Sequence, residues 1–184
     1  MKKDLNEVIE VPQGIVATIS GGVVNMKGNG KELRRVLPQS PKIKMELKDG
    51  KITLSSKNAT KRELALTNSL VAHIKNMIDG INEDFIYKLE ICNVHFPVTV
   101  RVEGKELRIK NFLGEKIERV ARIIDNVKVE IKGTGIEISS PDIEAAGQTA
   151  ARMELATKIR NRDRRVFQDG IFITEKPGRR DAKW

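Results

Sequence analysis

The chain has 184 residues, of which 39% are apolar and 32% charged, so it is long enough for one large or two small globular domains and is not disordered throughout. Its net charge of +9 favours a polyanionic partner, with nucleic acid ahead of a membrane surface. The excess of positive charge is unevenly distributed along the chain. Residues 152–184 hold ten Lys and Arg against five Asp and Glu, a net charge of +5, which leaves a net charge of +4 for the first 151 residues.

The amino-terminal part of the chain is expected to form strands. Residues 8–24 place short apolar runs between glycine-containing turns, which predicts a hairpin, and residues 25–30 are expected to form a glycine-rich connection. Residues 42–56 alternate apolar and charged side chains, with a turn at Asp49 and Gly50. This alternation predicts a second hairpin with one solvated face.

A helix is expected over residues 61–79, because apolar side chains recur there at spacings of three and four. Thr60 and Glu63 have the spacing of a capping box, and Gly80 is expected to end the helix. Strand patterns then return at residues 85–91, 98–102 and 107–109.

An internal repeat organises the chain. Residues 43–56 align without a gap on residues 127–140, and a helix is expected after each hairpin. The identical pairs are Lys44/Lys128, Glu46/Glu130, Lys48/Lys132, Ile52/Ile136, Ser55/Ser139 and Ser56/Ser140. The same offset places Arg35 over Arg119. We therefore expect an α+β fold made by tandem duplication of two small domains, each an antiparallel sheet packed on one helix.

The expected domains are residues 1–82 for the first repeat, 83–165 for the second, and 166–184 for a basic C-terminal extension. In the second repeat, Ser140 is the expected N-cap of a helix rich in small residues, with Pro141 at its first position. That helix is expected to run into arginines, so the second repeat carries the basic segment and the first does not.

Five cations follow the second helix, at Lys158, Arg160, Arg162, Arg164 and Arg165, against the single acid Asp163. On a helix they would lie on several sides, which disfavours an amphipathic membrane face. Guanidinium groups bind phosphates bidentately, and Phe167 or Phe172 could stack on an unpaired base, although core packing is favoured for at least one of them. Lys176, Arg179 and Arg180 form an irregular basic tail. We predict RNA binding by Lys158, Arg160, Arg162, Arg164, Arg165, Lys176, Arg179 and Arg180, with Phe167 and Gly170 shaping their support.

No catalytic, metal or cofactor site is predicted. His73 and His95 belong to different halves, and Cys92 has no second cysteine with which to form a disulfide or a zinc site. The run from Gly28 to Lys31 lacks the first glycine and the hydroxyl residue of a phosphate-binding loop. A single cysteine in an apolar run, and an amino terminus without a signal-peptide core, predict a cytoplasmic protein.

Two segments resemble a known family. Residues 142–151, Asp-Ile-Glu-Ala-Ala-Gly-Gln-Thr-Ala-Ala, and residues 160–172, Arg-Asn-Arg-Asp-Arg-Arg-Val-Phe-Gln-Asp-Gly-Ile-Phe, are similar to the C-terminal signature of the large-subunit ribosomal protein L-six family. The branch resembled is the archaeal and eukaryotic one, since the Tyr-Lys-Gly-Lys-Gly type segment of the bacterial branch is absent. The resemblance extends over nearly the whole chain, because this family too is a tandem duplication of a small α+β unit.

The resemblance implies a structural constituent of the large ribosomal subunit that is not an enzyme. It implies binding to large-subunit rRNA near the sarcin-ricin region and the stalk base, beside neighbouring large-subunit ribosomal proteins, where translational GTPases dock. It implies no membrane partner. The alternative is a free-standing RNA- or DNA-binding module outside the ribosome. A nucleic-acid-processing enzyme is a further rival, which the absence of a carboxylate or histidine cluster disfavours.

Overall fold

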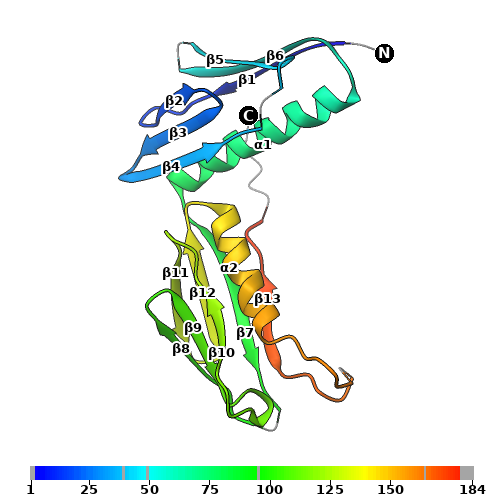
Figure 1. Ribbon diagram of the computed structural model, residues 1–184. Helices are drawn as coiled ribbons and strands as arrows, with labels where there is room; N and C mark the ends of the chain where they lie inside the picture. Colours follow the sequence, from blue (N-terminus) through cyan, green and yellow to red (C-terminus); the bar gives the residue numbers. More distant parts are fainter. Residues whose placement is uncertain (1–2, 39, 49, 95, 164, 179–184) are drawn as a thin grey trace. The chain divides into compact units, whose positions relative to one another are not determined.

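The computed structural model describes residues 3–178 except residues 39, 49, 95 and 164, and it contains two compact units, residues 1–84 and 85–184 (Figure 1). The division between the units falls after Asp84, slightly beyond the expected one. Asp84, whose carboxylate forms an ion pair with Lys31 at 2.8 Å, belongs to the first unit.

The first unit contains two three-stranded antiparallel sheets and one helix. One sheet has the order β1 (Lys3–Glu10), β6 (Lys51–Ala59), β5 (Lys44–Lys48), and the other has the order β2 (Val16–Ser20), β3 (Val23–Gly28), β4 (Lys31–Val36). Helix α1 (Lys61–Asn82) packs on both sheets. The core between them is formed by buried apolar side chains, among them Ile9, Val24, Met26, Ile52, Leu54, Ile74 and Ile78.

The expected glycine-rich connection at residues 25–30 is in fact most of strand β3 and a tight turn. Asn29 and Gly30 both have positive φ, 51° and 73°, which gives the two-residue turn that joins β3 to β4. A phosphate-binding loop is therefore not formed here. Gly28 is needed for another reason, since a Cβ at this position would lie 2.9 Å from the carbonyl oxygen of Gly14.

Helix α1 begins as predicted and ends later. The carboxylate of Glu63 accepts a hydrogen bond from the backbone N–H of Thr60 at 2.8 Å and another from its hydroxyl, which confirms the capping box. Gly80 does not end the helix, because it is buried within the last turn, and its carbonyl accepts a hydrogen bond from Lys31 Nζ at 3.4 Å. Burial and this contact hold the last turn helical as far as Asn82.

The second unit repeats this plan with one strand more. Its larger sheet has the order β11 (Lys128–Lys132), β12 (Gly135–Ser140), β7 (Phe85–Cys92), β13 (Gly170–Glu175), and its smaller sheet has the order β10 (Arg119–Arg122), β9 (Glu106–Lys110), β8 (Thr99–Glu103). Helix α2 (Ile143–Ala156) packs on both sheets, and the short helix η1 (Phe112–Gly114) follows β9.

The N-cap of α2 is Asp142, whose carboxylate accepts a hydrogen bond from the N–H of Glu144 at 2.9 Å. Ser140, the expected N-cap, has a different role. Its hydroxyl accepts from the N–H of Asp142 at 3.1 Å and donates to the carbonyl of Asn126 at 3.0 Å. Ser140 therefore fastens the end of β12 to the loop before β11, and the cap falls further along the chain.

Strand register confirms the duplication. Met45 lies opposite Leu54 in the first unit, and Val129 lies opposite Ile138 at the corresponding place in the second. What differs is strand β13, which pairs antiparallel with β7 and has no counterpart beside β1 among the described residues (Figure 1). Residues 170–175 are thus part of the second unit and not of an extension, because the buried Ile171 joins its core.

Candidate nucleic-acid interface

The predicted basic segment is a loop. Helix α2 ends at Ala156 and β13 begins at Gly170, so residues 157–169 form an irregular connection that carries most of the predicted RNA-binding cations. The expectation that the helix would run into the arginines is wrong, because Thr157 turns the chain out of the helix.

The loop is fastened at its first residue. Thr157 is 3% exposed, and its hydroxyl donates to the carbonyl of Glu154 at 3.1 Å and accepts from the N–H of Ile171 at 2.9 Å. One side chain thus ties the end of α2 to the start of β13. Without it, the N–H of the buried Ile171 would lack this acceptor.

The loop is fastened again at its last residue. Asp169 is 4% exposed, and its carboxylate accepts a hydrogen bond from the N–H of Val94 at 2.9 Å, in the segment that follows β7. Both ends of the loop are therefore held to the body of the unit, which limits the conformational entropy that binding would cost.

A third fastening comes from Arg119, at the start of β10. Its guanidinium donates to the carbonyls of Ala156 at 2.9 Å and Lys158 at 3.2 Å, and it binds both carboxylate oxygens of Glu115 at 2.6 and 2.8 Å. It also lies 4.3 Å from the centre of the Phe112 ring. This cation satisfies carbonyls at the C-terminal end of α2, where positive charge is favoured. Its hydrogen bonds hold the pKa of the Glu115 carboxyl below its usual value.

The exposed face of the loop is cationic. Lys158, Arg160, Arg162 and Arg165 are exposed, as is Lys176 after β13. Within the described part of the chain, Arg165 alone among these five forms an ion pair, with Asp163 at 2.8 Å, and its side chain is 90% exposed. The pair holds the pKa of Asp163 below its usual value. Lys158, Arg160 and Arg162 on the loop, and Lys176 beyond β13, therefore form no ion pair with a described carboxylate.

Phe167 supports one of these cations. The Arg162 guanidinium lies over the Phe167 ring, 4.9 Å from its centre, in a cation–π contact. The Arg162 guanidinium thus covers one face of the Phe167 ring, and the Phe167 side chain is half-buried. The contact holds Arg162 beside the loop, and the supporting role of Phe167 in RNA binding stays a prediction.

Gly170 is a close-packing position. Its φ is not positive, and it is the first residue of β13. A Cβ at this position would lie 2.9 Å from the ring of Phe172. The missing side chain therefore makes room for the Phe172 ring beside the loop.

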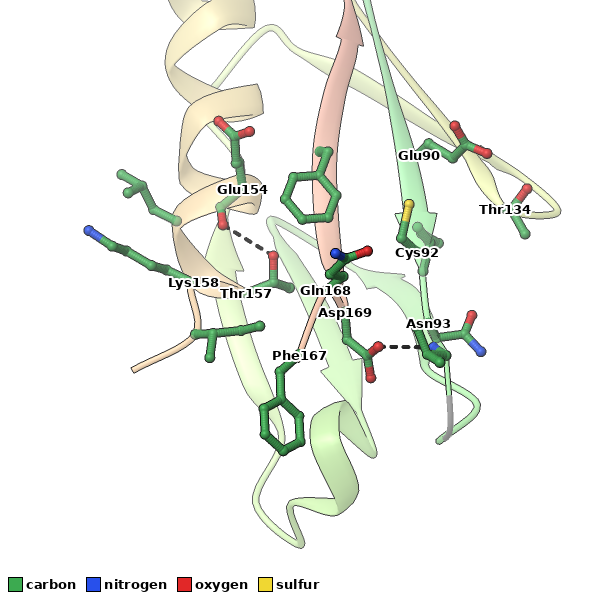
Figure 2. Close-up of a pocket in the computed structure, with 15 residues that line it drawn as sticks. Glu90, Cys92, Asn93, Thr134, Glu154, Thr157, Lys158, Phe167, Gln168 and Asp169 are labelled. Atoms are coloured by element: carbon green, nitrogen blue, oxygen red, sulfur yellow. Dashed lines mark hydrogen bonds between the residues drawn. The ribbon is translucent and has the colours of Figure 1, made fainter. Parts of the chain in front are cut away.

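A cavity of about 980 Å³ lies behind the loop, between the ends of β7 and α2 and the start of β13 (Figure 2). Glu90, Glu154 and Asp169 contribute carboxylates to its wall, and Lys158 contributes the single cation. An anion is disfavoured in such a cavity. Phosphate contacts therefore belong on the exposed face of the loop and not in the cavity.

Three of the predicted residues, Arg164, Arg179 and Arg180, lie outside the described residues. The structure brings together Lys158, Arg160, Arg162, Arg165, Phe167 and Gly170 on the loop and at its end, while Lys176 lies at the far end of β13. The predicted set omitted the fastening residues. The sequence marked Arg119 through the repeat, since Arg35 occupies the same place in the first copy, and Asp169 through the family signature at residues 160–172, but nothing marked Thr157.

No catalytic constellation accompanies the loop. Among the described residues there is no group of His, Cys, Asp and Glu that could hold a metal ion. Burial raises the pKa of the half-buried Cys92 thiol, with Glu90 and Asp169 adding to the effect, so this thiol is poorly suited to act as a nucleophile. No helix among the described residues is long and apolar enough to cross a membrane.

Comparison with known proteins gives one family. The sequence matches the family model described as Ribosomal protein L6 over residues 11–84 and 96–170, one range in each unit. It is 42% identical to the Large ribosomal subunit protein uL6 of Aeropyrum pernix, over 96% of this chain and 98% of that protein. The proteins of the same name from Sulfurisphaera tokodaii and Saccharolobus solfataricus are 44% and 42% identical, each over 94% of this chain and over 92% and 95% of their own lengths.

Proposed function

Because this chain belongs to the Ribosomal protein L6 family, in its archaeal branch, we propose that it binds large-subunit rRNA through the loop of residues 157–169. As a member of this family it is a structural constituent of the large ribosomal subunit and not an enzyme, with rRNA and other ribosomal proteins as partners. This membership favours the ribosomal function over a free-standing RNA- or DNA-binding module, and it supports our proposal that the protein works in the cytoplasm.

The observation that carries the proposal is the exposed cationic face of a loop whose base is fastened. Arg160 and Arg162 are exposed without a described ion-pair partner, while Thr157 and Asp169 hold the loop ends in place. Exposed guanidinium groups on a held backbone bind phosphate oxygens with little ordering cost. Such backbone contacts position a protein on RNA and supply most of its affinity.

We assign phosphate contacts to the exposed cations and support to the residues beneath them. The phosphate-binding set is Lys158, Arg160, Arg162, Arg164, Arg165, Lys176, Arg179 and Arg180, of which Arg164, Arg179 and Arg180 are assigned from the sequence alone. Phe167 supports Arg162, and Gly170 gives room to the Phe172 ring.

The first experiment measures binding of the full chain to large-subunit rRNA at several salt concentrations. Arg160→Ala with Arg162→Ala should weaken binding and reduce the slope of log affinity against log salt by roughly 1.5 to 2, the loss of about two phosphate contacts. The matched control is Lys105→Ala with Lys132→Ala. It removes two cations from the same unit that are neutralised by Asp125 and Glu137.

The control pair should leave the slope nearly unchanged. Equal losses of slope from the two double variants would mean that net charge acts in place of this loop, and would overturn the assignment. A separate requirement is that the full chain sediments with large subunits at moderate salt. Release as free protein would contradict the ribosomal function itself.

Within the subunit, we place the protein near the sarcin-ricin region and the stalk base, where it supports the docking site of translational GTPases. This placement rests on the family resemblance. Hydroxyl-radical footprinting of the rRNA, with and without the chain, tests it. Protection in those two regions is expected, and protection confined to other regions would refute the placement.

A further inference from the structure

The outer edge of strand β1 is left without a partner in the first unit. Among the described residues β1 has one sheet neighbour, β6, whereas its counterpart β7 lies between β12 and β13. The two strands correspond residue by residue, because Ile9 lies opposite Ile52, and Leu89 lies opposite Ile136, the counterpart of Ile52 in the repeat. The duplicated unit thus occurs once with this edge free and once with it covered.

The backbone of β1 presents hydrogen-bonding groups at this edge. The N–H of Val11, just after β1, donates to the carbonyl of Gly50 at 2.9 Å, on the β6 side. Because successive residues of a strand face opposite sides, the backbone groups of Asn6, Val8 and Glu10 point away from β6. The second unit has the same arrangement, in which Ile91 donates to the carbonyl of Thr134 at 2.8 Å and the alternate residues of β7 face β13.

This edge is also accessible and regular. Residues 5–10 pair with β6 without a shift, a length that matches the six residues of β13. Asn6, Glu7 and Glu10 are exposed, and Val8 is 51% exposed. Residues 5–10 contain no proline or lysine, two residues that commonly protect sheet edges from pairing, and their charged residues are Glu7 and Glu10. Among the described strands, the opposite edge of the sheet has no further neighbour in either unit, at β5 in the first and at its counterpart β11 in the second. The duplication therefore shows β1 as the edge that accepts a strand.

The charge of β1 selects the class of partner. Its exposed carboxylates are Asp4, Glu7 and Glu10, of which Asp4 accepts a hydrogen bond from the N–H of Asn58 at 2.8 Å and Glu10 pairs with Lys51 at 2.6 Å, so that Glu7 is the carboxylate without a described partner. Carboxylates along the edge disfavour an RNA backbone and favour a polypeptide that carries cations. Strand β13 shows the apolar pattern required, since Ile171 and Ile173 pack into the core of its unit.

We propose that the outer edge of β1 binds an extended, basic segment of a neighbouring large-subunit ribosomal protein, which adds an antiparallel strand to the sheet as β13 does in the second unit. The identity of the partner as a ribosomal protein rests on the proposed function. The geometry of the edge does not.

The test places a photo-reactive benzophenone residue at Val8 of the full-length chain, in cells from which large subunits are then purified. The matched control places it at Glu46, an exposed position on β5 at the opposite edge of the same sheet. We expect cross-links from Val8 to another polypeptide, at least about fivefold more abundant than those from Glu46. Cross-links from Val8 to RNA alone or to this chain, or a yield no higher than that from Glu46, would overturn the inference.

A second variant examines the backbone. In the background of a benzophenone at Glu10, Val8→Pro removes an N–H that points away from β6, a position at which an edge strand tolerates proline. The free chain should keep its Tm, and the protein cross-link should fall at least about fivefold through the lost hydrogen bond and the added ring. Glu7→Pro removes an N–H that faces β6 and should destabilise the free chain. A cross-link that survives Val8→Pro unchanged would mean that no strand is added.

These results separate the inference from the proposed function. If the chain fails to enter large subunits, the proposed function is wrong. If it enters them and Val8 cross-links to no other protein, the function stands and the inference about β1 is wrong.

Discussion

Removing the hydroxyl of Thr157 should destabilise the second unit. Thr157→Val keeps the shape of the side chain but leaves the N–H of Ile171, which belongs to a residue 1% exposed, without its acceptor at 2.9 Å. An unsatisfied buried donor costs about 1–3 kcal/mol. For a domain of this size the Tm should fall by at least about 4 °C. The same free energy should speed exchange of the Ile171 amide by about fivefold or more, if exchange proceeds through opening at this point.

Thermal unfolding followed by circular dichroism, with amide exchange of Ile171 by NMR, measures both effects. Thr174→Val is the matched control, because Thr174 lies on the same strand and donates to the carbonyl of Lys88 at 3.1 Å, but is exposed. It should change stability by less than about 0.5 kcal/mol. Thr157→Ser keeps the hydroxyl and should restore the exchange protection of Ile171. Equal effects of the two valine variants, or no recovery with serine, would refute the role of the hydroxyl.

The capping box predicts a pH dependence. Hydrogen bonds from Thr60, first from its hydroxyl and then from its N–H, lower the pKa of Glu63 from 4.5 to about 2, so the ionised carboxylate stabilises the fold above pH 4.5 and this stability is lost as the pH falls toward 2. Thermal melts from pH 7 to 2 should show the parent chain losing stability relative to Glu63→Gln over this range, and parallel curves would contradict the assignment. A Cβ at Gly147 would lie 2.8 Å from the Tyr87 hydroxyl. In the parent chain, Gly147→Ala should therefore not give the stability gain of about 1 kcal/mol that alanine usually brings to a helix. In the Tyr87→Phe background the same substitution should recover part of that gain. Chemical denaturation measures both effects, and equal effects in the two backgrounds would exclude this contact.

The capping box and the hairpin at residues 42–56 were predictable because their signals are local. Alternating side chains and the short spacing of a cap need no distant partner. The end of α1 was not predictable in this way. Gly80 looks like a helix terminator, but burial and the contact with Lys31, on a distant strand, keep it helical. A prediction from the local sequence fails where tertiary packing outweighs the unfavourable helix propensity of glycine, which is about 1 kcal/mol.

In the candidate site, too, some residues could be predicted from the local sequence and others could not. Its cations, Lys158 to Arg165, are visible in the sequence because charge density is a property of composition. The contacts by which Thr157, Asp169 and Arg119 fasten the loop are not visible in the sequence, since each is made across the fold. Thr157 meets Ile171, Asp169 meets Val94, and Arg119 meets Ala156.

The sequence by itself determined the duplication, the family and the basic segment, because repeats, signatures and charge need no coordinates. Only the tertiary structure decided that residues 170–175 form a strand of the second sheet and not an extension. Alternation at Ile171 and Ile173 is compatible with several partners, and pairing with β7, at the start of the second unit, selects one. That added strand turns the basic segment into a loop held at both ends, and it leaves β1 as the corresponding uncovered edge among the described strands.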